Sequence, residues 1–448
     1  MKRTMKATLE DISQVKKKLS VEIDAKEVNK KLNTAYGKIG KQTKIPGFRP
    51  GKVPRKILES YFGSQVEADV ASELVNESFP KAVEETGAFP LNQPQLEKGE
   101  VKLNEKFVYS ATMEVRPKFE VKDYLGLEAE KEIVSIGENE VLKKLEQIRE
   151  GNGKLESLAE PRPIQDGDFA VINYQGFEND APLDGIKDEN FLLNVGKGDF
   201  HKSIDEALIG LNKDDKKDVV VDFEEDYFND NLKGKTVRFE VLVTDIKERN
   251  LPELNDEFAK NLGADFEDLK GLKEEIEKNV VAQEKTRVEQ DLKRRLLGKI
   301  SEGTEFEVPQ TLVDAEVAFS VKSLQANFER SGASFEKAGI SPEMLKQQFG
   351  PASESRVKER LILGQIARQD DVTISDDEFT EGLEKMAQGM GQDVETIRKY
   401  YEARGEVDIL QEQMLEEKTL DYLVENAKIK EVAAGALTPD KSDEKEAQ

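Results

Sequence analysis

A phenylalanine and two cations lie close together in one segment of the chain, Ile45-Pro46-Gly47-Phe48-Arg49-Pro50-Gly51-Lys52-Val53-Pro54. Pro50 supplies the fixed φ and Gly51 the positive φ of a type II turn, and the flanking prolines resist regular structure. The pattern predicts a protruding turn with Phe48 at its tip. A phenylalanine carries roughly 150–250 Å² of surface, so an exposed ring needs a partner. The alternative is that Phe48 folds back and plugs its own domain.

The charge around this turn is opposite in sign to that of the rest of the chain. Between Lys26 and Lys56 there are ten lysines and arginines against one anion, Glu27, which gives a net charge of +9. Residues 1–60 carry 16 cations and 6 anions, a net +10, whereas the whole chain carries −25, so the remainder carries −35. This asymmetry favours a basic module that docks on a polyanion, with the ring and the arginine adding specific contacts.

The run Gly47-Phe48-Arg49-x-Gly51-Lys52-Val53-Pro54 resembles the ribosome-docking motif of the trigger factor family of bacterial chaperones. Chain length and domain order agree with that family, although Pro50 stands where the family usually has a lysine. The resemblance implies that the large ribosomal subunit, near its exit tunnel, is bound through protein and RNA by six residues: Gly47, Phe48, Arg49, Pro50, Gly51 and Lys52. It also implies that nascent and unfolded polypeptides are partners, and that two copies can pair away from the ribosome.

Composition excludes several other classes of protein. A length of 448 residues indicates about three domains, and 37% hydrophobic with 35% charged residues indicates a highly solvated protein. Because the chain has no cysteine and one histidine, His201, disulfides, thiol chemistry and multi-histidine metal sites are excluded. Gly234-Lys235-Thr236 resembles the end of a phosphate loop, but Asn229 replaces its first glycine, so we expect no ATP and no other cofactor. The absence of an apolar leader or membrane-length run leads us to expect a cytoplasmic protein with no membrane partner.

Residues 1–118 show the pattern of an α+β domain. Val15 to Ile23 alternate as a half-buried strand, and Asp24-x-x-Glu27 resembles a capping box before a helix. A second helix is predicted from Ile57 to about Gly87 with a break near Gly63, and Phe107 to Val115 alternate as another strand. Residues 119–153 are interpreted as a connector that packs with the C-terminal domain. It is extended through Val121 to Val134 and helical from Glu138 to Glu150.

Residues 154–249 change to the pattern of a small antiparallel sheet, with alternation at Ala170–Tyr174, Val219–Phe223 and Val237–Val243. Gly167-Asp168, Gly176, Leu183-Asp184, Phe191, Gly196-x-Gly198 and the strand around Phe239 resemble the FK506-binding-protein type of prolyl isomerase. That resemblance implies peptidyl-prolyl cis-trans isomerase activity in a cradle formed by Tyr174, Asp184, Phe191, Tyr227 and Phe239. The alternative interpretation is that these residues are ordinary sheet core.

The chemistry of such a domain needs no nucleophile, because isomerisation only twists an amide across a barrier of about 18–20 kcal/mol. A dry, apolar cradle that favours the twisted state is sufficient. This chain departs from the isomerase pattern: Phe200-His201-Lys202-Ser203-Ile204 replaces a Val-Ile-x-Gly-Trp run, and Leu183 replaces an aromatic residue. The departures favour weak or lost turnover. We interpret His201 as a partly exposed surface residue rather than a general base.

From Leu251 onward strand patterns disappear and helical periodicity continues to about residue 430. Glu267–Ile300 forms one candidate helix, another follows Val308-Pro309 with a stripe at Val317, Val321, Leu324 and Phe328, and Ser375-x-x-Glu378 resembles a capping box. Residues 250–432 are therefore predicted to be an all-α domain with helical arms, and 433–448 a disordered tail. The stripes are interhelical core by default. The trigger factor resemblance adds apolar patches for clients, to which Met344, Met386, Met390 and Met414 are suited.

Three functions compete. The first is an ATP-independent chaperone that docks at the ribosome, shields nascent chains and carries a prolyl isomerase domain. The second is a free-standing prolyl isomerase whose other domains deliver substrate. The third is an RNA-binding protein that uses the basic segment alone, whose binding would fall steeply with salt even with Phe48 intact.

Overall fold

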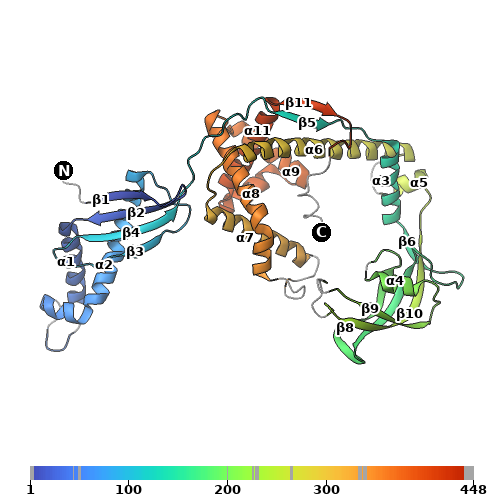
Figure 1. The fold of residues 1–448 in the computed structure, drawn as a ribbon, viewed down its shortest axis with the longest axis horizontal. Helices are drawn as coiled ribbons and strands as arrows, with labels where there is room; N and C mark the ends of the chain where they lie inside the picture. The colour runs from blue at the N-terminus through green and yellow to red at the C-terminus, as the bar shows by residue number, and fades with distance from the viewer. Residues whose placement is uncertain are drawn as a thin grey trace. The chain divides into compact units, whose positions relative to one another are not determined.

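The computed structural model describes residues 5–43, 45–48, 52–198, 200–224, 227, 232–262, 266–330, 335 and 341–437 (Figure 1). The chain forms two compact units. The first comprises Met1–Leu127, Arg295–Leu324 and Pro342–Ala427, and the second comprises Glu128–Arg294, Gln325–Ser341 and Lys428–Gln448. Among the described residues, no helix combines the length and apolarity that a membrane crossing requires.

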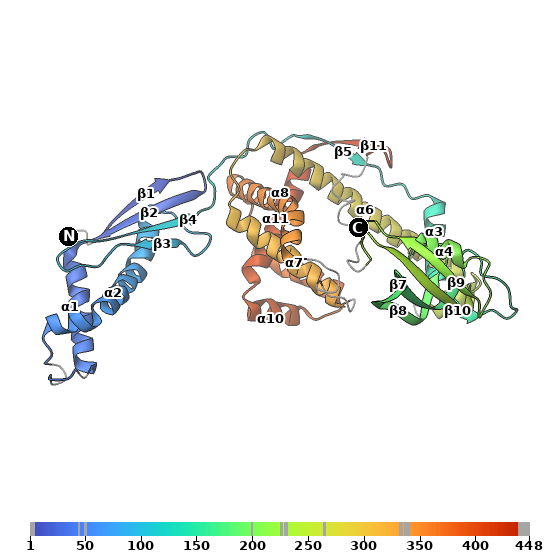
Figure 2. The ribbon, with the colours of Figure 1, turned by 60° about the horizontal axis from the view of Figure 1, so that its bottom comes forward.

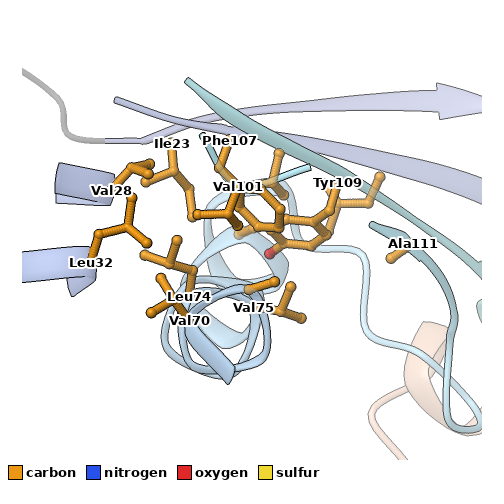
Figure 3. Packing of buried hydrophobic residues seen from close by; sticks show 14 of the residues in the cluster. Ile23, Val28, Leu32, Val70, Leu74, Val75, Val101, Phe107, Tyr109 and Ala111 are labelled. Atoms are coloured by element: carbon orange, nitrogen blue, oxygen red, sulfur yellow. The ribbon is translucent and has the colours of Figure 1, made fainter. Parts of the chain in front are cut away.

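The N-terminal part of the first unit is a four-stranded antiparallel sheet packed on two helices. The strands are β1 (Met5–Asp11), β2 (Lys16–Ile23), β3 (Gln95–Lys98) and β4 (Phe107–Glu114), in the order β1-β2-β4-β3. Burial alternates along β4, so one face of the sheet is covered. Figure 3 shows side chains of that face, such as Phe107 and Tyr109, meeting Leu32 of α1 (Ala25–Gln42) and Leu74 of α2 (Arg55–Thr86). The predicted α+β architecture is confirmed here.

Two local predictions in this region are wrong. No break occurs at Gly63, because α2 is one continuous helix of 32 residues. Burial of Leu58, Val66 and neighbouring residues along one face outweighs the cost of about 1 kcal/mol for a glycine within a helix. Asp24 precedes α1, but its side chain makes no capping hydrogen bond. The Glu27 carboxylate pairs instead with Lys30, one turn further along (3.3 Å).

The remainder of the first unit is helical. It is built from the end of α6 (Leu269–Gly303), α7 (Gln310–Arg330), α8 (Pro342–Gln369), α9 (Asp376–Met390), α10 (Val394–Arg404) and α11 (Val407–Glu425). Val121, after the N-terminal domain, joins the core formed by Leu297, Ile362 and Leu423. The capping box of α9 is confirmed: Glu378 N–H donates to Ser375 Oγ (3.3 Å), and Ser375 N–H donates to the Glu378 carboxylate (2.8 Å).

The second unit contains a five-stranded antiparallel sheet. Its strands are β6 (Lys154–Ser157), β7 (Phe169–Glu178), β8 (Ala181–Asn194), β9 (Lys216–Asp222) and β10 (Thr236–Asn250). The order is β6-β10-β7-β8, and β9 also pairs with β10. The short helix α4 (Lys202–Leu208) contributes Ile204 and Leu208 to the core of this sheet, together with Phe239. The predicted small antiparallel sheet is confirmed.

The second unit also contains a helical corner and a two-stranded ribbon. Leu145 of α3 (Glu138–Gly151) packs with Phe258 of α5 (Asp256–Asn261) and with Leu272 of α6. β5 (Glu128–Glu132) lies beside β11 (Lys428–Val432) in parallel, as Figures 1 and 2 show. The prediction that strands are absent after residue 251 is therefore wrong. Four of the five residues of β11 are exposed, so the strand carries no hydrophobic alternation to predict it.

Candidate functional site

The segment between α1 and α2 begins with a tight turn anchored in the core. Ile45 is buried, and the N–H of Phe48 donates to the Ile45 carbonyl oxygen (3.1 Å). Pro46 and Gly47 occupy the two central positions, and Gly47 has φ 87°, as a type II turn requires of its third residue. The observed turn is centred on Pro46-Gly47, whereas the predicted turn is centred on Pro50-Gly51. Arg49, Pro50 and Gly51 lie outside the described residues.

Phe48 is 39% exposed, and it is not among the residues that pack against the core of its domain. The two helix ends that carry the segment approach each other closely. A Cβ added to Gly40 of α1 would lie 3.2 Å from Leu58 Cδ1 of α2, so a larger residue there would require the Leu58 side chain to shift. The small Gly40 thus lets both ends of the segment emerge from one place, and Phe48 follows there as a partly exposed side chain.

The cations around this turn fall into two groups. Some are used within the domain: Lys31 binds Glu73 (2.7 Å) and Glu77, whose hydrogen bonds raise the pKa of Lys31, and Arg55 lies over the Tyr36 ring (5.1 Å). Others are exposed, and among the described residues no carboxylate pairs with them; these are Lys38, Lys41, Lys52 and Lys56. The second group is available to an external anion.

An aromatic cradle lies on the sheet of the second unit. Tyr174 of β7 contacts Phe191 of β8 and Phe239 of β10, with ring centroids 5.7 and 6.1 Å apart. Phe200, just before α4, contacts all three of these rings. Its centroid lies 4.9 Å from that of Tyr174, 5.8 Å from that of Phe191 and 5.5 Å from that of Phe239. These four side chains form one apolar surface.

A second group of rings continues from Phe239. Phe223 lies 6.2 Å from Phe239 and 4.6 Å from Tyr227. His201 lies 5.4 Å from Phe223, and its Nδ1 accepts a hydrogen bond from Ser203 N–H (3.2 Å), so it caps α4. His201 therefore has a structural role at the start of this helix.

The two acidic side chains near the cradle differ in position. Asp184 on β8 is exposed and does not belong to the cluster of packed residues. Asp188 lies opposite Tyr174 in the β7–β8 register. Burial raises the pKa of the Tyr174 hydroxyl, and the charge of Asp188 adds to this effect. The structure thus brings together Tyr174, Phe191, Tyr227 and Phe239, but not Asp184.

Sequence reasoning did not place two rings of this site, Phe200 and Phe223. In the sequence Phe200 is a departure from the isomerase pattern, and Phe223 is the end of an alternating strand. The signal that would have found Phe223 is that alternation, since it continues the inward-facing positions Val219 and Val221. The cradle is lined by aromatic and aliphatic groups, so it can desolvate an amide but supplies no nucleophile.

The helical part of the first unit exposes several large apolar side chains. Phe319 of α7 is 66% exposed, Met344 of α8 61% and Met390 of α9 57%. Of the other two methionines singled out in the sequence, Met386 and Met414 pack against the core of α9 to α11. The predicted stripe of α7 is buried at Val317, whereas Val321, Leu324 and Phe328 are half-buried.

An α+β domain with an exposed aromatic turn, a prolyl-isomerase-type sheet and a helical body with exposed apolar groups together define an isomerase-bearing chaperone. Family models agree. Residues 5–148 match the bacterial trigger factor protein, 268–425 match its C-terminus, and 160–244 match the FKBP-type peptidyl-prolyl cis-trans isomerase.

Relatives cover nearly the whole chain. The trigger factor of Geobacter sulfurreducens is 35% identical over 95% of this chain and 99% of its own, and that of Syntrophotalea carbinolica is 36% identical over 97% and 98%. A solved trigger factor chaperone aligns with 93% of this chain and 99% of its own at 19% identity, with a TM-score of 0.46. The chain belongs to the trigger factor family. It is a chaperone with a ribosome-binding N-terminal domain and a peptidyl-prolyl cis-trans isomerase domain, rather than a free-standing isomerase.

Proposed function

We propose that the chain docks on the large ribosomal subunit near the exit tunnel through the segment between α1 and α2. The residues that make contact with ribosomal protein and RNA are Gly47, Phe48, Arg49, Pro50, Gly51 and Lys52. The observation that carries this proposal is the exposure of Phe48 on a turn whose neighbour, Ile45, is anchored in the core. Lys38, Lys41 and Lys56 add attraction to phosphate because they are exposed and unpaired within the described residues.

The domains divide this work among them. Residues 1–118 bind the ribosome, 154–249 form the isomerase domain, and 250–432 form the helical body that holds clients, with 119–153 as a connector to it and 433–448 as a tail. The core shared by Val121 with Leu297 and Ile362, and by Leu145 with Leu272, supports the place of the connector. Holding needs no ATP, because exposed side chains such as Phe319 and Met390 offer weak apolar contacts that a client can leave.

The isomerase site is the aromatic cradle, with Tyr174, Phe191, Tyr227 and Phe239 around the substrate proline, whereas the exposed Asp184 of β8 is not part of it. The ring contacts among Tyr174, Phe191 and Phe239 support this position. The chain acts in the cytoplasm, where ribosomes and nascent chains are. Away from the ribosome, two copies pair, since a basic N-terminal module and a remainder of charge −35 attract each other between copies. Sedimentation velocity over a range of concentration and salt tests this pairing.

Ribosome docking is tested by co-sedimentation of the full chain and of Phe48→Ala with ribosomes, with and without nascent chains. Central aromatic residues of interfaces cost about 2 kcal/mol or more when truncated, which is roughly 30-fold in Kd. We expect a loss of this size in Phe48→Ala at unchanged stability.

The matched control is Phe89→Ala. Phe89 is 64% exposed and follows the far end of α2, whose 32 residues span about 48 Å, so its loss removes an exposed ring without touching the turn. Equal binding of the two variants would contradict the proposal. A lowered melting temperature of Phe48→Ala with unchanged binding would show instead that the ring plugs its own domain.

A further inference from the structure

Phe200 occupies the middle of the aromatic cradle. Within the part of the chain that the structure describes, it is the one ring in direct contact with Tyr174, Phe191 and Phe239 together, at centroid separations of 4.9, 5.8 and 5.5 Å. All three separations fall within the range of about 4.5–7 Å over which aromatic rings touch. Phe200 therefore packs against Phe191 and Phe239, two of the residues that a prolyl ring would contact in the proposed site.

The contacts that Phe200 makes are ones that a substrate ring would use. Tyr174 also touches Phe191 and Phe239 directly, with ring centroids 5.7 and 6.1 Å apart, so the rings of the proposed site already pack against one another. A prolyl ring that packs on the same rings needs carbon contacts of about 3.5–4.0 Å. It would therefore compete with the Phe200 ring for these contacts.

The sequence around α4 explains how the ring comes to lie there. Phe200 directly precedes His201, the residue that caps α4, so the helix start fixes its backbone. One turn later Ile204 is fully buried beneath the cradle, where the isomerase pattern has a tryptophan. Phe200 packs against the same buried cluster that contains Ile204. Because protein interiors are close-packed, a small residue at 204 is compatible with a large one at 200.

We propose that Phe200 is a built-in plug of the isomerase site, and that a substrate proline binds only when this ring has left the cradle. The inference rests on the proposed position of the isomerase site. Three aromatic contacts of ordinary strength must be given up on opening, so the open state is disfavoured roughly tenfold to thousandfold, and apparent substrate affinity falls by the same factor. Phe200 thereby determines which substrates turn over: those whose residue before proline can replace its contacts.

The test compares the full chain with Phe200→Val. A chromogenic Ala-Leu-Pro-Phe anilide reports isomerisation, and a fluorescent form of the same tetrapeptide reports binding by anisotropy. We expect kcat/KM and affinity both to rise by about tenfold or more in Phe200→Val. The double variant Phe200→Val, Phe239→Ala must lose this gain, because it removes a cradle wall while leaving the plug absent. Hydrogen exchange of the β7 amides verifies that the sheet is folded, and Phe200→Leu replaces Phe200→Val if the latter does not fold.

Unchanged or reduced binding and turnover in a folded Phe200→Val protein would overturn the plug, and show that Phe200 is a wall or floor of the site. A gain that survives in the double variant would overturn it as well, since that gain arises outside the cradle. If binding tightens in Phe200→Val while neither protein isomerises the peptide, the plug stands and the proposed isomerase site fails.

Discussion

Ser78 and Tyr109 form a buried hydrogen bond between α2 and β4. Removing the serine hydroxyl should destabilise the domain by a different amount from removing the tyrosine hydroxyl. Ser78 Oγ donates to the Leu74 carbonyl oxygen (2.7 Å) and lies 2.8 Å from Tyr109 Oη. A serine hydroxyl has one hydrogen, so Tyr109 must be the donor to Ser78. The tyrosine is 1% exposed, and Figure 3 shows its ring within the core, so water cannot replace a lost partner.

Removing either group therefore has a different consequence. Ser78→Ala leaves the Tyr109 hydroxyl buried without an acceptor, which costs about 1–3 kcal/mol, whereas Tyr109→Phe leaves Ser78 bound to Leu74 and costs about 1 kcal/mol. At tenfold per 1.4 kcal/mol, these costs correspond to roughly 5–150-fold and 5-fold changes in the local opening equilibrium. The double variant must be more stable than Ser78→Ala alone, because it contains no orphaned hydroxyl.

The assay is hydrogen exchange of the β4 and α2 amides in the full chain, since a chain of several domains does not unfold in one step and exchange reports each region separately. Ser72→Ala is the matched control: Ser72 makes the same bond to the carbonyl four residues back (3.0 Å), but from the surface of α2. If Tyr109→Phe proves more damaging than Ser78→Ala, or the double variant is the least stable, the assigned direction of the hydrogen bond is wrong.

Three further predictions concern other parts of the chain. Hydrogen bonds from Lys418, and then from Ser375, lower the pKa of Glu378 from 4.5 to about 2. The stabilising contribution of the Glu378 carboxylate is therefore complete above pH 4.5 and is lost as the pH falls towards 2. In Glu378→Gln, hydrogen exchange of the α9 amides should depend less on pH. Arg287→Met should leave the buried Glu132 without its guanidinium partner (2.8 Å), at a cost of roughly 1–3 kcal/mol, and speed exchange in β5 and β11. Phe319→Ser should weaken suppression of client aggregation, measured by light scattering, at unchanged melting temperature, because the ring is 66% exposed.

Elements with one buried face could be predicted from the sequence. In β4 the residues from Phe107 to Met113 alternate between core and surface, and in α1 Val28, Leu32 and Tyr36 are buried at helical spacing. Strands that are held by hydrogen bonds to a neighbouring strand, and that have no buried face of their own, could not be predicted. All four residues of β3 are exposed, as is most of β8, so hydrogen bonds to β4 and β7 define them and leave no periodic trace.

The residues of the candidate site also divide into those that the sequence predicts and those that it does not. The order of glycines and aromatics along residues 167–239 was enough to name Tyr174, Phe191 and Phe239, which the sheet brings together. The effect of one residue on the packing of another could not be predicted from the sequence. In the sequence Phe200 and Ile204 each read as the loss of an isomerase residue, and only the structure shows that both pack in one cluster with Phe239. Asp184 is named by its place in a motif, but it lies where the β7–β8 register shifts and is exposed there.

We expect docking and stability to be separable in the N-terminal domain, because the proposed docking turn and Ser78 lie at different places along α2. Arg55, at its start, adjoins the docking turn, whereas Ser78 lies 23 residues further along, about 35 Å away at 1.5 Å per residue. Phe48 is exposed and is not one of the buried residues of the domain core, so its loss should weaken ribosome binding and leave exchange of the β4 amides unchanged. Ser78→Ala should do the reverse while the domain stays folded. A ribosome-binding defect in Ser78→Ala at full folding would mean that the turn depends on distant packing, and that the close approach of Gly40 to Leu58 is not sufficient to position it.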